Sequence, residues 1–494
     1  MFESAELGHQ VKKSQYEKDA PRLRSALLDA QFDVLQHARF PVIVVIGGVE
    51  GAGKGELVNV LHNWMDPHHL RVVALDTPTD EERERPHFWR FWRNLPPKGE
   101  TGIFLGSWYT RPIEQRVHKA ARRSDYVEEL ERIERFERLL AHDGALLLKF
   151  WLHLSKKAQR KRFEELEADK LTRWRVSKED WAKHAHYDRY RAVCEETLRR
   201  TSTGDAPWIV IDAEDARYRN LSVGRELLEA MRRRLKGDQP KRKAKRALRV
   251  SKPLDGVNAL SALDLDKELD SKRYPELLEK YQGRLNRLVR DERFQDRALV
   301  IAFEGVDAAG KGGAIERVIA ALDARWYRVV PVAAPTEEER AQPYLWRFWR
   351  RLPRVGHASI FDRSWYGRVL VERVENFCST EAWSRAYGEI NDLEAQLHDH
   401  GTIVSKFWLQ ISPTVQLERF KEREVISYKR YKITPEDWRN RRKWDAYQLA
   451  ASDMVDRTST EIAPWTLVPA TDKQYARIHV LKTLVKQLEQ ALDK

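Results

Sequence analysis

Short apolar, β-branched runs alternate along this chain with longer stretches in which apolar residues recur at helical spacing. In the second half, the run "RALVIAFEGV" at 297–306 is almost continuously apolar and ends in a glycine-rich segment, which is typical of a buried parallel strand. The next segment, "KGGAIERVIAALD" at 311–323, has the apolar spacing of a helix. A strand, a glycine-rich turn and a helix in succession indicate an α/β unit.

The same half contains further strand patterns and one long helical pattern that stops at Gly401. The strands are predicted at 327–335, 357–366, 402–412 and 463–470, and the helix at 380–401. Because strands alternate with helices, we expect an α/β fold with a parallel sheet flanked by helices on both faces. Ligands bind at the carboxyl ends of such strands, so the polar segments there should share one edge. These segments are Gly305–Gly313, Pro335–Thr336, Asp362–Tyr366 and Ser412.

The pattern occurs twice. The segment "PVIVVIGGVEGAGKGELV" at 41–58 matches "ALVIAFEGVDAAGKGGAI" at 298–315, which pairs Gly48 with Gly305 at a separation of 257 positions. The stretches 78–96 and 335–353 match at the same separation. This spacing is too long for a solenoid repeat and indicates two tandem copies of one domain. We predict a first domain at 1–235, a linker at 236–252 and a second domain at 253–494.

The predicted linker, "KGDQPKRKAKRALRVSK", is strongly basic, and the whole chain of 494 residues has a formal net charge of +13. A solvated tether and an arm that contacts a polyanion are both compatible with the linker. The net charge is compatible with a polyanionic partner, although a solvated basic surface without a ligand would give the same net charge. The sequence is also compatible with a homo-oligomer.

Several classes of protein are disfavoured by the sequence. Its two cysteines, Cys194 and Cys378, form neither a disulfide framework nor a metal-binding spacing. The N-terminal residues are charged and lack the apolar core of a signal peptide, and no apolar run approaches the roughly 20 residues that span a membrane. We therefore expect a cytoplasmic protein without a membrane partner.

The glycine-rich segment of the second copy has the form of a phosphate-binding, Walker A type loop, with Gly305, Gly310 and Lys311 at the expected spacing. Backbone N–H groups of such a loop surround phosphate oxygens, and the helix that follows favours an anion at its N-terminus. Gly312 stands where these loops usually carry a magnesium-binding Ser or Thr, and Gly313 follows it. The loop therefore predicts phosphate binding but does not by itself explain metal binding.

Two carboxylates are candidates for the metal. Asp307 lies in the loop, and Asp362 ends the predicted strand in "SIFDRSWYGR", where phosphoryl-transfer enzymes place a metal-holding Asp. Mg²⁺ takes one or two protein carboxylates and completes its shell with water and phosphate oxygens. The alternative role for Asp362 is a helix cap or an ion-pair partner of Arg363.

Basic residues surround the same edge. The segment "WRFWRRLPR" at 346–354 either stacks bases on its aromatic rings or, as we prefer, packs those rings in the core. The segment at 420–447 lies where nucleotide-handling kinases have a mobile lid, although a solvated helical face would look similar. Its candidate phosphate clamps are Arg423, Lys429, Arg430 and Lys432.

The segments "GVDAAGKGG" at 305–313, "FDRSWYGR" at 361–368 and "KITPEDW" at 432–438 together resemble the polyphosphate kinase 2 family, and the doubled arrangement resembles its tandem-domain form. The resemblance implies two P-loop kinase-like domains with helical lids and Mg²⁺-dependent phosphoryl transfer between inorganic polyphosphate and a nucleotide. For the tandem form it implies AMP as the acceptor. It also implies site roles, namely metal binding or catalysis for Asp307 and Asp362, phosphate binding for Lys311, Arg363 and Arg368, and a lid position for Lys432.

The first copy departs from this pattern. It has Leu105 in place of Asp362 and Gly106 in place of Arg363, while Glu50 replaces Asp307. A leucine cannot bind Mg²⁺, so we expect the first copy to be catalytically degenerate, binding anions weakly or only supporting the fold.

Two rival functions remain open at this point. One is an ATP-dependent nucleotide or small-molecule kinase of the same P-loop class, and the other is a non-catalytic protein that binds a polyanion or nucleic acid. Polyphosphate has no base to recognise, so a phosphate loop and a basic channel suffice for it, and we do not expect nucleic acid as the partner. The aromatic residues Trp365, Tyr366 and Trp438 could stack on a base or could belong to the core.

Overall fold

The computed structural model describes residues 1–237, 258–427 and 429–493. Most of the predicted linker at 236–252, and the side chain of Lys432, lie outside the described part. The chain forms two compact units, the first comprising Met1–Pro78, Arg90–Arg242 and Thr336–Pro343 and the second Thr79–Trp89, Lys243–Pro335 and Tyr344–Lys494. The domain limits inferred from the repeat stay a prediction.

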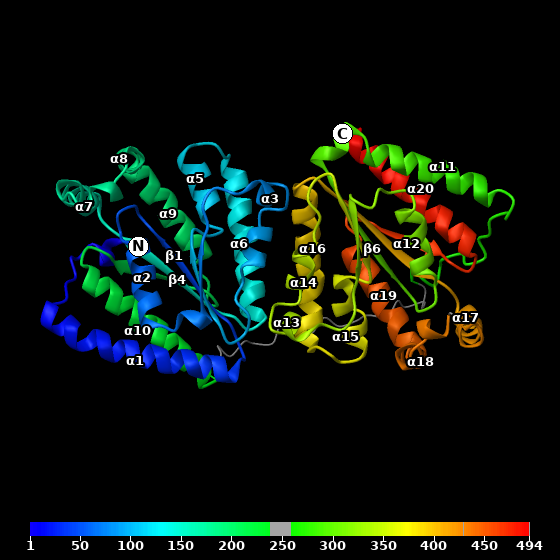
Figure 1. The fold of residues 1–494 in the computed structure, drawn as a ribbon, viewed down its shortest axis with the longest axis horizontal. Helices are drawn as coiled ribbons and strands as arrows, with labels where there is room; N and C mark the ends of the chain where they lie inside the picture. The colour runs from blue at the N-terminus through cyan, green and yellow to red at the C-terminus, as the bar shows by residue number, and fades with distance from the viewer. Residues whose placement is uncertain (238–257, 428, 494) are drawn as a thin grey trace. The chain divides into compact units, whose positions relative to one another are not determined.

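Each unit is built on a five-stranded parallel sheet (Figure 1). The first has the order β2-β3-β1-β4-β5 and comprises β1 (Val42–Gly48), β2 (Leu70–Ala74), β3 (Thr101–Leu105), β4 (Leu146–His153) and β5 (Trp208–Asp212). The second has the matching order β7-β8-β6-β9-β10 and comprises β6 (Ala298–Gly305), β7 (Tyr327–Pro331), β8 (Ala358–Asp362), β9 (Thr402–Gln410) and β10 (Trp465–Pro469). All five strands predicted in the second half are confirmed, as is the α/β class.

Helices cover both faces of each sheet. Those between residues 1 and 237 are α1 (Lys13–His37), α2 (Lys54–Trp64), α3 (Asp80–Arg83), α4 (Trp89–Arg93), α5 (Thr110–Val117), α6 (Arg123–His142), α7 (Lys156–Ala168), α8 (Lys178–Ala185), α9 (Tyr187–Thr201) and α10 (Ala216–Leu235). Those after residue 257 are α11 (Tyr274–Val289), α12 (Lys311–Ile319), α13 (Glu337–Arg340), α14 (Trp346–Trp349), α15 (Val371–Val374), α16 (Thr380–Asp399), α17 (Pro413–Val425), α18 (Pro435–Arg442), α19 (Trp444–Thr458) and α20 (Lys473–Leu492). In the second unit α11 and α12 pack with α20, whereas α15 and α16 pack with α19 (Figure 1).

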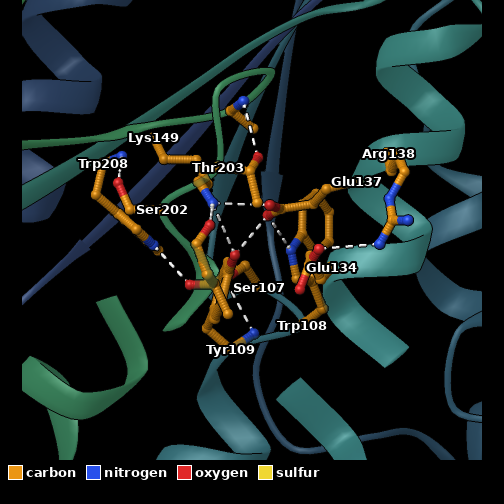
Figure 2. A network of polar contacts seen from close by, with 12 residues as sticks. Ser107, Trp108, Tyr109, Glu134, Glu137, Arg138, Lys149, Ser202, Thr203 and Trp208 are labelled. Atoms are coloured by element: carbon orange, nitrogen blue, oxygen red, sulfur yellow. Dashed lines mark hydrogen bonds and ion pairs between the residues drawn. The ribbon is translucent and has the colours of Figure 1, made fainter. Parts of the chain in front are cut away.

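A buried polar network ties the loop after β3 to the sheet and to α6 in the first unit (Figure 2). Lys149 of β4 is fully buried, and its Nζ lies 2.7 Å from Oε2 of Glu137 and 3.0 Å from the hydroxyl of Tyr109. Tyr109 donates to Glu137 in turn, at 2.6 Å. Removing one partner of a buried ion pair typically costs about 3–5 kcal/mol, because the other charge is left uncompensated. The network therefore holds the strand-end loop rigidly in place.

The second unit repeats this network beneath its own strand-end loop. Lys406 Nζ lies 2.8 Å from Oε2 of Glu394, and the Tyr366 hydroxyl donates to Oε1 of Glu394 at 2.6 Å. Trp365 and Tyr366 are both fully buried, so they belong to the core and do not stack on a ligand. Their burial fixes the backbone that follows Asp362.

Among the residues that the structure describes, no helix combines the length and the apolar character needed to cross a bilayer.

Candidate active site

The glycine-rich loop of the second unit joins β6 to α12 at the carboxyl edge of the sheet. Gly305 has φ 144°, and a Cβ there would lie 2.4 Å from the backbone oxygen of Leu409, so a larger residue does not fit. Gly310 has φ 108° and caps the N-terminus of α12. The first N–H groups of a helix, here those of Lys311, Gly312 and Gly313, have no partner within the helix. The loop thus presents N–H groups and the positive end of the helix dipole to an anion.

Lys311 folds back over the loop. Its Nζ donates to the backbone oxygens of Gly305 at 2.8 Å and of Val306 at 3.3 Å. Burial lowers the pKa of Lys311, an effect that the nearby carboxylate of Asp307 opposes. The ammonium group is thereby fixed beside the loop, where it can neutralise phosphate charge.

Arg363 connects the end of β8 with the loop. Its Nη2 lies 3.1 Å from Oδ1 of Asp307. Burial acts to lower the pKa of Arg363, but the summed attraction of Asp307, Glu304 and Asp362 raises it. Arg363 is also one of few described non-glycine residues with positive φ, at 64°. Such strained conformations cost of order 1–3 kcal/mol and cluster at functional sites, which supports a role for this side chain beyond packing.

Asp362 is the last residue of β8, as predicted, and its backbone pairs with Phe303 in β6. Asp362 and Asp307 both attract the Lys311 ammonium group and act to raise its pKa. The described residues contain no group of three or more His, Cys, Asp or Glu side chains able to hold a metal ion. Two carboxylates nevertheless fit Mg²⁺, because phosphate oxygens and water supply its remaining ligands.

Glu304 is a site residue that the sequence analysis missed. It lies in β6, is 5% exposed, and accepts a 2.8 Å hydrogen bond from the hydroxyl of Ser364. Burial raises its pKa. The first unit has Gly47 at the equivalent position. A carboxylate inside an apolar strand was the signal that could have identified it, because buried carboxylates are rare unless paired or functional.

The lid predicted from the basic segment at 420–447 contains α17 and α18, and both contact the loop. Asn440 of α18 donates from Nδ2 to Oδ2 of Asp307 at 2.9 Å, and Gln416 of α17 donates from Nε2 to the Asp307 backbone oxygen at 3.1 Å. A capping box formed by Thr434 and Asp437 starts α18. The lid helices therefore touch the residue proposed to bind metal.

Arg419 of α17 was also missed. It is 8% exposed, and its guanidinium donates to the backbone oxygens of Ala308 at 2.9 Å and of Ala470 and Thr471 at 2.8 Å each. Arginine suits this role because its donors form a rigid fork. Arg419 thus links the loop to the end of β10.

A cavity of about 320 Å³ lies beside the N-terminus of α12 and includes Gly310 and Gly313 in its wall. Its basic lining residues are Arg317, Arg419, Arg423, Lys429, Lys473 and Arg477. They face two acidic lining residues, Glu316 and Glu422, so the cavity has an excess of positive charge. Ala308, Ala309 and Gly310 of the phosphate loop form part of its wall.

The remaining predicted clamps take different positions. Lys429 lines this cavity and also pairs with Glu422 at 2.5 Å. Arg430 is exposed, with its guanidinium 5.3 Å from the ring centroid of Tyr431. The guanidinium of Arg368 lies 4.2 Å from the Tyr344 ring centroid.

The aromatic residues at 346–349 pack inward, as preferred from the sequence. Trp346, Phe348 and Trp349 of α14 are all buried. Trp438 is half-buried and packs edge-on against Phe420 at 5.1 Å between ring centroids. These contacts favour core roles over base stacking.

The first unit retains the loop but not the acidic strand end. Lys54 Nζ donates to the Gly48 backbone oxygen at 3.0 Å and to Glu50 Oε2 at 3.1 Å. The attraction of Lys54 lowers the pKa of Glu50. Leu105 ends β3, and Gly106 follows with φ 76°. The strained arginine and the strand-end carboxylate of the second unit therefore have no counterpart at these positions.

Comparisons with known proteins point to one family. A family model described as Polyphosphate kinase 2 (PPK2) matches residues 10–239 and 268–494. The chain is 55% identical over 494 residues to a polyphosphate:AMP phosphotransferase from Pseudomonas aeruginosa, covering 100% of each chain. A relative with the same name from Pseudomonas syringae is 52% identical over 491 residues, covering 99% of each. A crystal structure assigned to polyphosphate kinase 2 from Pseudomonas aeruginosa PA01 has 53% identity and a TM-score of 0.90, with 100% of both chains covered.

Proposed function

The chain belongs to the polyphosphate kinase 2 family, and we propose that it transfers phosphoryl groups from inorganic polyphosphate to AMP, forming ADP. The relatives of matching length that carry the name polyphosphate:AMP phosphotransferase support this choice of substrates. The observation that carries the proposal is the second unit's loop, where Lys311 and the Asp307–Arg363 pair lie beside a cationic cavity and Asp362 attracts the Lys311 ammonium group. We propose that the first unit does not catalyse the reaction.

The reaction is a single displacement. An oxygen of the AMP phosphate forms a bond to the terminal phosphorus of polyphosphate, and the bridging P–O bond of that terminal unit breaks, so the chain shortens by one unit. The acceptor oxygen is already ionised at neutral pH, so no strong general base is required. Catalysis then depends on alignment and on neutralising the charge of the transferred group.

Each residue of the loop has a part in this scheme. The N–H groups at the start of α12 and the Lys311 ammonium orient the terminal phosphoryl group, and Arg363 stabilises its developing charge. Asp307 and Asp362 would hold a magnesium ion, which supplies neutralisation of the phosphate oxygens when bound. The basic cavity accommodates the rest of the polyphosphate chain, whose charge it matches.

The test is a turnover assay with purified protein, polyphosphate, Mg²⁺ and AMP, without ATP, followed by separation of nucleotides. Formation of ADP supports the proposal. An enzyme that phosphorylates AMP only when ATP is supplied would identify an ATP-dependent kinase instead, and binding of polyphosphate without turnover would identify a non-catalytic polyanion-binding protein.

Initial rates then decide the acceptor. AMP and ADP are each titrated against saturating polyphosphate, and we expect a higher kcat/KM for AMP. An acceptor held at fixed distance fits one phosphate tail length, because an extra phosphate would displace the polyphosphate end. A kcat/KM for ADP equal to or above that for AMP would contradict the AMP assignment but not the polyphosphate kinase assignment.

We also propose that the protein acts in the cytoplasm, where AMP is available. Both cysteines, Cys194 and Cys378, are free, which suits a reducing compartment.

A further inference from the structure

The first turn of α2 in the first unit carries Glu56, at the position that Gly313 occupies in the second unit. Three arginines converge on its carboxylate. Oε1 lies 2.9 Å from Nη1 of Arg175 and 3.2 Å from Nη2 of Arg162, and Oε2 lies 3.4 Å from Nη2 of Arg219. These arginines come from three different elements, so the fold gathers an arginine cluster around one half-buried carboxylate at the N-terminus of the helix that follows the phosphate loop.

Arg219 also fills the space beside the loop. Its side chain is 3% exposed, and Nη1 donates to the backbone oxygen of Ala52 at 3.0 Å. A Cβ placed on Gly53 would lie 1.8 Å from this nitrogen, whereas a Cβ on the equivalent Gly310 would have no neighbour within 4 Å. Arg219 therefore occupies the space beside Gly53 in the first unit, whereas the equivalent space beside Gly310 is open in the second. A separate cavity of about 350 Å³ lies on the other side of the first unit's loop, against Glu50, Lys54 and Leu105.

We propose that Glu56 is a built-in substitute for phosphate, which occupies an oxyanion site of the first unit formed by Arg162, Arg175 and Arg219 and so keeps polyphosphate away from the start of α2. A carboxylate presents anionic oxygens to guanidinium groups much as phosphate does. Three guanidinium charges against one carboxylate leave the site cationic, so it retains affinity for a more highly charged oxyanion once Glu56 is neutralised. The site is thus latent, and its occupation by Glu56 weakens polyphosphate binding by the first unit in addition to the loss of the strand-end carboxylate, where Leu105 stands.

The first test measures binding without turnover. Inorganic tripolyphosphate is titrated calorimetrically into the full chain carrying Glu56→Gln, and into a control carrying Glu164→Gln. Glu164 is an exposed residue of α7 that pairs with Arg160 at 2.8 Å, so both variants lose one negative charge. We expect Glu56→Gln to bind about one more equivalent of tripolyphosphate than the control. Equal stoichiometry in the two folded variants would overturn the proposal.

The second test introduces a carboxylate at the equivalent position of the second unit. Its result does not depend on whether Glu56→Gln folds. Gly313→Glu places a carboxylate beside Arg477, whose Nη2 would lie 3.2 Å from the new Cβ. We expect its KM for polyphosphate to rise at least tenfold above that of the uncharged Gly313→Gln, and equal KM values for the two would count against the proposal. This arm alone rests on the proposed polyphosphate kinase activity. The calorimetric result does not depend on that activity. The proposed role of Glu56 and the proposed kinase activity can therefore be refuted separately.

Discussion

The amide of Asn440 donates from Nδ2 to Oδ2 of Asp307 at 2.9 Å, so lid helix α18 is anchored on the phosphate loop. The other oxygen of Asp307 pairs with Arg363. The first unit has a related contact at the equivalent positions, where Lys183 lies 3.5 Å from Glu50. In both units the helix at this position, α18 or its counterpart α8, thus contacts the carboxylate of the loop.

Replacing Asn440 with Asp should open the lid. The substitution exchanges a hydrogen-bond donor for a like charge beside Asp307, and like charges at this distance repel. We expect faster tryptic cleavage within the basic segment 429–443 and a fall of about tenfold in kcat/KM for polyphosphate, which corresponds to ~1.4 kcal/mol. Asn391, which donates to the Arg457 backbone oxygen elsewhere in the unit, supplies the control Asn391→Asp. Equal cleavage rates for the two variants would contradict the anchoring role of Asn440.

The carboxylate of Asp362 should be essential for turnover but not for folding. Asp362 ends a strand at the edge of the site and does not lie in the core. Asp362→Asn keeps the side-chain volume and removes the charge that is proposed to hold magnesium. Loss of one electrostatic stabiliser lowers kcat about 10²–10³-fold, and loss of the metal should lower it further. The measurement combines kcat with the thermal unfolding midpoint. A variant with more than a tenth of the original kcat would refute the metal-binding role of Asp362.

The two loop lysines provide a matched pair. Lys311 and Lys54 make the same hydrogen bond to a loop carbonyl, at 2.8 and 3.0 Å, but only Lys311 lies near a strand-end carboxylate and a strained arginine. We expect Lys311→Ala to lower kcat/KM at least about 10²-fold and Lys54→Ala to lower it less than threefold. Similar losses for the two variants would show that the first unit takes part in catalysis.

The parts of this site that could be predicted from sequence are those that depend on neighbours in the chain. The strand before Gly305, the helix after Lys311 and the strand-end position of Asp362 all follow from local apolar patterns, and the parallel sheet then brings them to one edge. Asn440 and Arg419 could not be predicted, because each contacts the loop across more than 100 residues and neither has a local signal. Their positions depend on how α17 and α18 pack.

Two site residues, Glu304 and Glu56, could have been found by comparing the two copies position by position. Glu304 is a carboxylate in an apolar strand and has a glycine, Gly47, as its counterpart. Glu56 stands where the second copy has Gly313, two residues after the loop lysine. Differences between copies at otherwise matching positions therefore mark the residues that separate the two units chemically.

Salt should affect polyphosphate more than AMP. A chain of phosphates held by several cations releases many counterions on binding, whereas a nucleotide with few charges releases few. We expect the KM for polyphosphate to rise steeply between low and high ionic strength. Arg423→Gln and Lys429→Gln alter two residues that line the cavity, and each should make the KM for polyphosphate less dependent on ionic strength. Lys157→Gln, an exposed change on α7, should not. An unchanged slope in both cavity variants would place the polyphosphate chain elsewhere.

His153 at the end of β4 should make the stability of the first unit depend on pH. Its side chain is fully buried, and its Nε2 lies 2.8 Å from Oε1 of Glu6. Burial lowers the pKa of His153 below its ordinary value of 6.5, although the hydrogen bond to Glu6 opposes the shift. Arg191 also acts to lower the pKa and Asp212 to raise it. The net effect is that the folded chain keeps this imidazole neutral at a pH where the unfolded chain protonates it.

The sign of the pH effect follows from proton binding. Above about pH 7 both states carry a neutral imidazole, so His153 contributes no pH dependence. As the pH falls through 6.5 the unfolded state binds a proton that the folded state does not, and the free energy of unfolding decreases until the lowered pKa is reached.

The second unit has Gln410 at the equivalent position, which does not titrate. Urea unfolding of His153→Gln between pH 7.5 and 5 should therefore show a smaller loss of stability than the unaltered chain. His62→Gln, a change at an exposed histidine of α2, serves as the control. An equal loss in His153→Gln and in the unaltered chain would mean that His153 is protonated in the folded state.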